Sequence, residues 1–203
     1  VYETSSCGSD GLCRPVGGDR GGDGDMGQVI CSAEDDGDFT IDAAQIDEVL
    51  FARDGILASG SRDRTVLVAS TVDPDYVRGL PARVAAAGVT ILDTPVSGGP
   101  ARAAAGTMTI MVAGPREARE RCADVFAAIA GHTFAISDRV GDAAGTKIVN
   151  NLLAAANLAA AAEALALADA LGLDLRATAD VISASSGASW IFADRVPRAL
   201  DAD

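Results

Sequence analysis

The alternation of apolar and polar positions becomes regular only after about residue 40. A continuous apolar run with polar flanks, typical of a buried parallel strand, lies at 65–70, and further strands are predicted at 89–93, 107–113 and 133–136. Helical spacing of apolar residues, with capping signals before it, predicts helices at 42–51, 73–87 and 115–130. Pro81 lies inside the second helix and is expected to kink or split it. Alternating strands and helices predict an α/β fold with a mostly parallel sheet.

A long helical pattern replaces the strands after Gly141. Residues 143–171 contain no proline and end at Leu171-Gly172, a glycine signal for a helix C-terminus. Such a helix spans roughly 43 Å. It is too long for a small α/β crossover and is expected to join an α/β domain to a helical one. Shorter helical patterns follow at 175–184 and from 188 onward.

Residues 1–39 lack this regularity. They hold 9 of the 22 glycines, and nine acidic residues against only Arg14 and Arg20. Such a segment buries too little apolar surface to offset its ordering entropy, so disorder is expected. The letters from Gly22 to Gly27 match a G-x-G-x-x-G loop, but a strand-like stretch follows where a dinucleotide loop requires a helix. A phosphate site is therefore not expected there.

The composition narrows the classes of partner. The chain of 203 residues carries a net charge of −13, which disfavours binding to nucleic acid or to an anionic membrane. No uninterrupted apolar run reaches the roughly 18 residues of a membrane span, so a cytoplasmic protein is expected. The four cysteines and His132 follow no zinc-ligand spacing, and no metal site is predicted.

Lys147 is the only lysine among 16 basic residues, the others being arginine. Arginine keeps its proton in proteins, whereas a partly buried lysine can have its pKa moved toward neutrality. Asn151 stands four residues later on the same helix face, where its amide can orient an oxygen that Lys147 protonates. The helix dipole disfavours a lysine near a helix N-terminus, a cost that a purely structural lysine does not need. Taken by itself, a solvated surface lysine is the more common case.

A second candidate site follows the strand at 89–93. Gly98 and Gly99 allow backbone N–H groups to turn toward an anion, and Ser97 adds a hydroxyl group. Active sites of open α/β sheets lie beyond the carboxyl ends of strands, where this segment is expected. Thr71 follows the first strand, where its hydroxyl group can meet a cofactor. An ordinary Gly-Gly turn and a helix-capping Ser-Thr pair explain the same letters.

Three motifs in this order resemble the β-hydroxyacid dehydrogenase family. They are Asp93-Thr-Pro-Val-Ser-Gly-Gly99, Gly106-Thr-Met-Thr-Ile-Met-Val112, and Lys147-Ile-Val-Asn-Asn151 with Gly141 before it. The resemblance covers residues 40–203, and 43–51 and 189–198 are most similar to the L-threonate dehydrogenase branch. It implies an NAD(P)-dependent oxidoreductase. Such an enzyme transfers a hydride between nicotinamide and a small β-hydroxy acid of the L-threonate or 3-hydroxyisobutyrate type.

The resemblance also implies a role for each candidate residue. Lys147 would donate and accept the proton during hydride transfer, and Asn151 would orient the substrate. The segment from Ser97 to Gly99 would hold the carboxylate of a small hydroxy acid. Thr71 would lie near the nicotinamide end of NAD or NADP.

The implied fold is an incomplete Rossmann-like parallel sheet, a long spine helix and a truncated all-helical domain. Residues 1–39 would be an atypical Gly/Asp-rich segment, 40–140 a partial dinucleotide-binding domain, and 141–203 the start of a helical substrate and dimerisation domain. Family members have a strand, a G-x-G-x-M-G turn and a helix before the first strand predicted here, and further helices at the other end. The chain is therefore expected to be an incomplete copy. Complete members form homo-oligomers, which this truncation makes doubtful here.

Two alternatives stay open on the sequence alone. One is an inactive remnant that keeps part of the sheet and the spine helix but binds no dinucleotide. The other is a cofactor-free domain that binds small carboxylates through Ser97 to Gly99 and Lys147.

Overall fold

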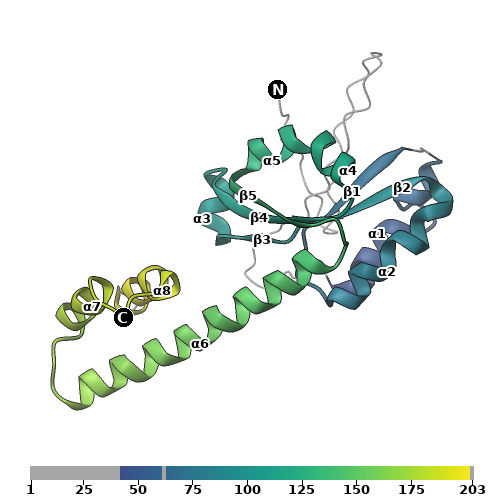
Figure 1. The fold of residues 1–203 in the computed structure, drawn as a ribbon. Helices are drawn as coiled ribbons and strands as arrows, with labels where there is room; N and C mark the ends of the chain where they lie inside the picture. Colours follow the sequence, from purple (N-terminus) through teal and green to yellow (C-terminus); the bar gives the residue numbers. More distant parts are fainter. Residues whose placement is uncertain (1–41, 61–62, 202–203) are drawn as a thin grey trace. The chain divides into compact units, whose positions relative to one another are not determined.

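A computed structural model describes residues 42–60 and 63–201 of the chain (Figure 1). They form two compact units, one ending at Lys147 and the other beginning at Ile148. The strands are β1 (Arg64–Val68), β2 (Val89–Asp93), β3 (Val96–Ser97), β4 (Met108–Ala113) and β5 (Ala130–Ser137). The helices are α1 (Ala43–Phe51), α2 (Pro74–Val84), α3 (Gly99–Ala104), α4 (Arg116–Arg121), α5 (Ala123–Ile129), α6 (Asp142–Ala170), α7 (Leu175–Ser183) and α8 (Trp190–Asp201), with 3-10 turns at Ile56–Ser59 and Ala85–Ala87. The expected disorder of 1–39, and the loop at 22–27, lie outside the described residues.

The sheet of the first unit is mixed but rich in parallel pairs. β1 and β2 run parallel, from Arg64 opposite Val89 to Val68 opposite Asp93. β2 then continues into β3, so the two strands share one edge of β4 and run antiparallel to it. β5 runs parallel to β4 along its other edge. The predicted α/β class is confirmed, although the chain doubles back at β3 and β4 instead of repeating a simple β-α-β unit.

Helices cover both faces of this sheet, with α1 and α2 on one side and α4 and α5 on the other (Figure 1). The side chains of β2 alternate between the two sides, as a strand requires. Ile91 packs in the cluster under α1 and α2, whereas Leu92 packs with Phe126 of α5. Asp93, two residues after Ile91, therefore points to the side of α1 and α2.

Several elements differ from those expected. α2 continues through Pro81 instead of splitting, because its apolar face is buried on both sides of the proline, at Val77, Leu80 and Val84. The single helix expected at 115–130 is divided at Cys122 into α4 and α5. β5 extends beyond the expected 133–136 because pairing with β4 orders its flanking residues, which carry no strand signal of their own.

The long helix predicted at 143–171 is observed as α6, which has 29 residues. Gly172 ends it with a φ of +68°, and the N–H of Leu173 donates to Ala168 O at 3.0 Å. The second unit has its own small core, made by Ala161 of α6, Ala179 of α7 and two residues of α8, Phe192 and Val196.

By length and mean hydropathy, α6 is long and apolar enough to cross a membrane, and only 11% of its most apolar stretch is buried. This qualifies the sequence argument, which considered uninterrupted apolar runs only. One helix of this length and composition is by itself weak evidence for a span. Asn150, Asn151 and Glu163 interrupt its apolar surface.

The start of α6 is tightly enclosed by the first unit. Gly141 precedes the helix with a φ of +98°, a conformation that side chains with a Cβ rarely adopt. A Cβ at this position would lie 2.7 Å from the carbonyl oxygen of Pro74, the first residue of α2. Glycine is therefore required here both by backbone conformation and by the close approach of α2.

Replacing Gly141 with alanine should lower the free energy of unfolding by about 1–3 kcal/mol, because the strained backbone and the contact with Pro74 cannot both relax. Urea unfolding followed by circular dichroism measures this loss. Gly145→Ala is the matched control, since Gly145 lies in α6 with no atom within 4 Å of a new Cβ, and should be neutral or mildly stabilising. Equal stability of the two variants would contradict the prediction.

Candidate functional site

Asp93 joins the end of β2 to the start of α6. Its side chain is 1% exposed, and Oδ2 accepts hydrogen bonds from the backbone N–H groups of Gly141 at 3.0 Å and Ala144 at 2.8 Å. The first N–H groups of a helix have no partner inside the helix. Burial raises the pKa of the Asp93 carboxyl group, and the hydrogen bonds from the backbone act in the opposite direction.

Lys147 lies in the second turn of α6 and is 8% exposed. Ala143, one turn earlier, is buried against Met111 and Ala113 of β4. Residues four apart share a helix face, so Lys147 lies on the face that α6 turns toward the first unit. Within residues 42–60 and 63–201, no hydrogen bond or ion pair reaches its ammonium group. Burial lowers the pKa of Lys147 below its ordinary value of 10.5.

The carboxyl ends of β1 and β2 lie side by side. The N–H of Thr94, which follows β2, donates to Val68 O at the end of β1, at 2.8 Å. Thr71 stands in the loop three residues after β1 rather than on the strand itself. Thr94 is buried, and among the described residues neither its Oγ1 nor Asp93 Oδ1 has a hydrogen-bond partner. Two buried oxygens at this edge are therefore left with unused acceptor capacity.

The segment Ser97-Gly98-Gly99 is not an unpaired turn, because it begins in β3, which pairs with β4. Ser97 lies opposite Thr109 in the β3–β4 pair. Gly98 and Gly99 have φ values of +141° and +69°, and a Cβ at Gly98 would lie 2.8 Å from Arg102. Both glycines are needed for the path of the chain. Ser97 is the fourth residue after Asp93, so their Cα atoms lie at most about 14 Å apart.

Asn151 lies in the second unit, four residues after Lys147 in α6, and is exposed. The amide of Asn150 donates to Asn151 Oδ1 at 3.4 Å, so the two amides touch each other. The structure thus brings the Asp93 segment to the start of the helix that carries Lys147. In the part of the chain that is described, no hydrogen bond or ion pair joins Lys147 to Ser97 or Thr71.

Sequence reasoning assigned no role of its own to Asp93. The signal that could have found it is an acidic residue at the end of an apolar strand, because a buried carboxyl group requires a partner. The identity of that partner, some fifty residues away, is not encoded locally.

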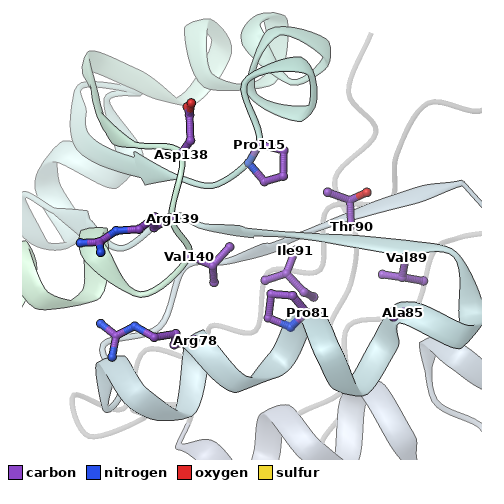
Figure 2. Close-up of a pocket in the computed structure, with 10 residues that line it drawn as sticks. All are labelled: Arg78, Pro81, Ala85, Val89, Thr90, Ile91, Pro115, Asp138, Arg139 and Val140. Atoms are coloured by element: carbon purple, nitrogen blue, oxygen red, sulfur yellow. The ribbon is translucent and has the colours of Figure 1, made fainter.

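A hollow of about 510 Å³ lies at a different place in the first unit (Figure 2). Val89 and Ile91 of β2 and Pro81 of α2 line it, and Arg78 and Arg139 extend toward the same side. Both arginines are already in ion pairs, with Asp75 and Asp142. None of the predicted site residues lines this hollow, so its size does not make it the candidate site.

Comparison with known proteins agrees with the motifs. Residues 39–141 match the family described as the NAD binding domain of 6-phosphogluconate dehydrogenase. Residues 141–203 match the family described as the NAD-binding of NADP-dependent 3-hydroxyisobutyrate dehydrogenase. The two matches together cover nearly all of the chain whose pattern is regular.

Individual relatives carry related names. The chain is 44% identical over 165 residues to L-threonate dehydrogenase of Cupriavidus necator, covering 81% of this chain and 56% of the relative. It is 37% identical to L-threonate dehydrogenase of Escherichia coli, with 81% and 55% covered. A crystal structure of 3-hydroxyisobutyrate dehydrogenase from Salmonella typhimurium is 38% identical, with a TM-score of 0.73 over 80% of this chain and 56% of that one.

The chain thus spans about half the length of the curated relatives that it matches. The residues of this chain that match, 39–203, include all three motifs and the junction between β2 and α6. On these grounds the chain belongs to the β-hydroxyacid dehydrogenase family, within the group that resembles 3-hydroxyisobutyrate and L-threonate dehydrogenases.

Proposed function

We propose that the chain acts in NAD(P)-dependent hydride transfer to and from a small β-hydroxy acid, with Lys147 as the proton donor and acceptor. The observation that carries the proposal is the environment of Lys147. A lysine that is 8% exposed, with no ion pair among the described residues, is a costly feature for a merely structural side chain. Such perturbed groups gather at functional sites.

The chemistry requires one proton and one hydride to move together. Nicotinamide, when bound, supplies or accepts the hydride. Lys147 as an amine takes the proton of the substrate hydroxyl group during oxidation, and as an ammonium returns it to the carbonyl oxygen during reduction. Because burial lowers the pKa of Lys147, a larger share of the amine exists near neutral pH than for a solvated lysine.

The carboxylate of the substrate is assigned to the segment Ser97 to Gly99. The hydroxyl group of Ser97 donates one hydrogen bond, and the backbone N–H groups of the two glycines can turn toward an anion. Their positive φ values support this assignment, since they free the backbone from the ordinary strand path. Asn151, one turn beyond Lys147 in α6, is proposed to orient the substrate.

The described residues fit the nicotinamide end of the cofactor. β1 and β2 end together, with Thr71 in the loop after β1, and Thr94, which follows β2, has a buried hydroxyl oxygen without a partner among the described residues. Thr71 is proposed to contact the cofactor there. Among the described residues, no turn with the G-x-G-x-x-G spacing of a pyrophosphate site lies between a strand and a helix. That part, and with it the choice between NAD and NADP, is assigned to no residue.

The proposed substrate is a hydroxy-carboxylate of the L-threonate or 3-hydroxyisobutyrate type, in a cytoplasmic protein that needs neither nucleic acid nor a membrane. The homologues' names and the net charge of −13 support this proposal. An assembly of several copies is supported by the large apolar side chains that α6 exposes: Ile148, Val149, Leu152, Leu153, Leu158 and Leu167.

Direct titration with NADH and NADPH tests the cofactor. Cofactor fluorescence and calorimetry should reveal binding of at least one of the two at sub-millimolar concentration. No binding up to several millimolar would remove the oxidoreductase proposal for this chain. Binding of a hydroxy acid in the absence of cofactor would instead favour a carboxylate-binding domain.

Lys147→Arg should lower kcat by at least about 100-fold, because arginine holds its proton throughout the working pH range. Steady-state kinetics with L-threonate and 3-hydroxyisobutyrate measure the loss. Asn150→Ala is a control on the same helix and should retain most activity, whereas Asn151→Ala should raise KM. Full turnover by Lys147→Arg would exclude the proton-transfer role.

The pH profile of oxidation should report Lys147. Since burial lowers its pKa, the amine that accepts a proton forms at lower pH than for a solvated lysine. The rate should therefore rise with pH and level off below 10.5, the ordinary lysine value. A limb that persists unchanged in Lys147→Ala would assign the titration to another group.

A further inference from the structure

We propose that Asp93 is the positioning residue for Lys147. Its buried carboxyl oxygen fixes the start of α6, and so fixes where the ammonium group lies. The role acts through hydrogen-bond acceptance and not through charge. The assignment of Lys147 to proton transfer rests on the proposed function, whereas the control of its place by Asp93 does not.

The first step is that α6 lacks a local cap. A helix often begins with an N-cap residue whose side chain accepts a hydrogen bond from a backbone N–H of the first turn. Asp42, Asp73 and Asp174 do this for α1, α2 and α7. Gly141 stands at that position before α6 and has no side chain to offer. Asp93, which lies 48 residues before Gly141 and 51 before Ala144, accepts from both N–H groups instead.

The second step connects this cap to Lys147. Ala143 and Ala144 are 0% and 1% exposed, which leaves the first turn no room to move sideways. Ala144 belongs to the cluster under α2, and Ala143 packs on β4. Lys147 stands one turn later on this same face. A shift of the helix start therefore moves Lys147 with it.

The third step separates acceptance from charge. No ion pair joins Asp93 to Lys147 among the described residues, and Lys147 does not contribute to the shift of the Asp93 pKa. Both hydrogen bonds go to Oδ2, while Oδ1 has no partner in the described part of the chain. One carbonyl-like oxygen is sufficient for the cap, and an asparagine supplies one.

The single lysine of the chain makes a direct test possible. With ¹³C- and ¹⁵N-labelled lysine, NMR gives one side-chain signal, whose titration measures the pKa of Lys147 without cofactor or turnover. The unmodified chain and Asp93→Asn should both titrate below the ordinary value of 10.5. Asp93→Ala should lose at least half of that shift.

A matched control shares the helix end and the residue type. Asp142 also lies in the first turn of α6, but it accepts from Ser137 and Arg139 side chains and not from the helix backbone. Asp142→Asn should leave the titration of Lys147 close to that of the unmodified chain. The proposal is overturned if Asp93→Ala keeps the original pKa of Lys147 while α6 remains helical, or if Asp93→Asn behaves like Asp93→Ala.

A second measurement covers the case in which Asp93→Ala does not fold. In the unmodified chain, the amide protons of Gly141 and Ala144 should exchange with solvent at least tenfold more slowly than that of Arg176, in the first turn of α7. Equal exchange rates would mean that the cap does not hold, which also overturns the proposal.

Kinetics then connect positioning to the proposed function. Asp93→Ala should lower kcat more than it changes KM, and Asp93→Asn should restore most of the lost kcat. If the unmodified chain shows no turnover, the proposed function fails, while the titration of Lys147 still decides the role of Asp93.

Discussion

One buried carboxyl oxygen, Asp93 Oδ2, supports the arrangement of the first unit around Lys147. It occupies the point where β2 ends and α6 begins, and it accepts from the helix at Gly141 and Ala144. A buried N–H group without a partner costs about 1–3 kcal/mol. Gly141 allows the chain to approach Pro74 closely enough for these bonds to form, and Ala143 and Ala144 let the helix pack down onto the sheet. The small side chains and the single hydrogen-bond acceptor together fix the position of the first turn of α6, which carries Lys147 one turn later.

Burial shifts the pKa values of Asp93 and Lys147 in opposite directions, but in both cases it favours the uncharged form. It raises the pKa of the Asp93 carboxyl group and lowers that of Lys147, so in each case the uncharged form gains. The backbone hydrogen bonds counteract this effect at Asp93, whereas nothing in the described residues counteracts it at Lys147. Burial at the junction of β2 and α6 is therefore partly offset in its effect on the pKa of Asp93 but not in its effect on the pKa of Lys147. That asymmetry suits the two proposed roles, a structural hydrogen-bond acceptor at Asp93 and a proton-exchanging group at Lys147.

The elements that could be predicted from sequence are those with strong local signals. The strand at 89–93 follows from its short, mostly apolar segment, and the ends of α6 follow from the glycines that flank the long helix. The antiparallel path of β3 and β4 could not be predicted, because Val96 and Ser97 form a strand only through pairing with Ile110 and Thr109. Lys147 stood out by its uniqueness. Asp93, which is proposed to position Lys147, did not stand out, because a contact between residues about fifty positions apart produces no periodic pattern in the sequence.

Because the first turn of α6 packs directly on the sheet, the number of residues between the cap at Ala144 and Lys147 is constrained. Asp93 sets the register at Ala144, and Lys147 is the third residue after Ala144. Each residue of an α-helix turns the chain by about 100°. One residue inserted or deleted in this interval would rotate the lysine away from the sheet without disturbing the cap. Related chains should therefore vary freely in the length of their loops and yet keep this interval constant.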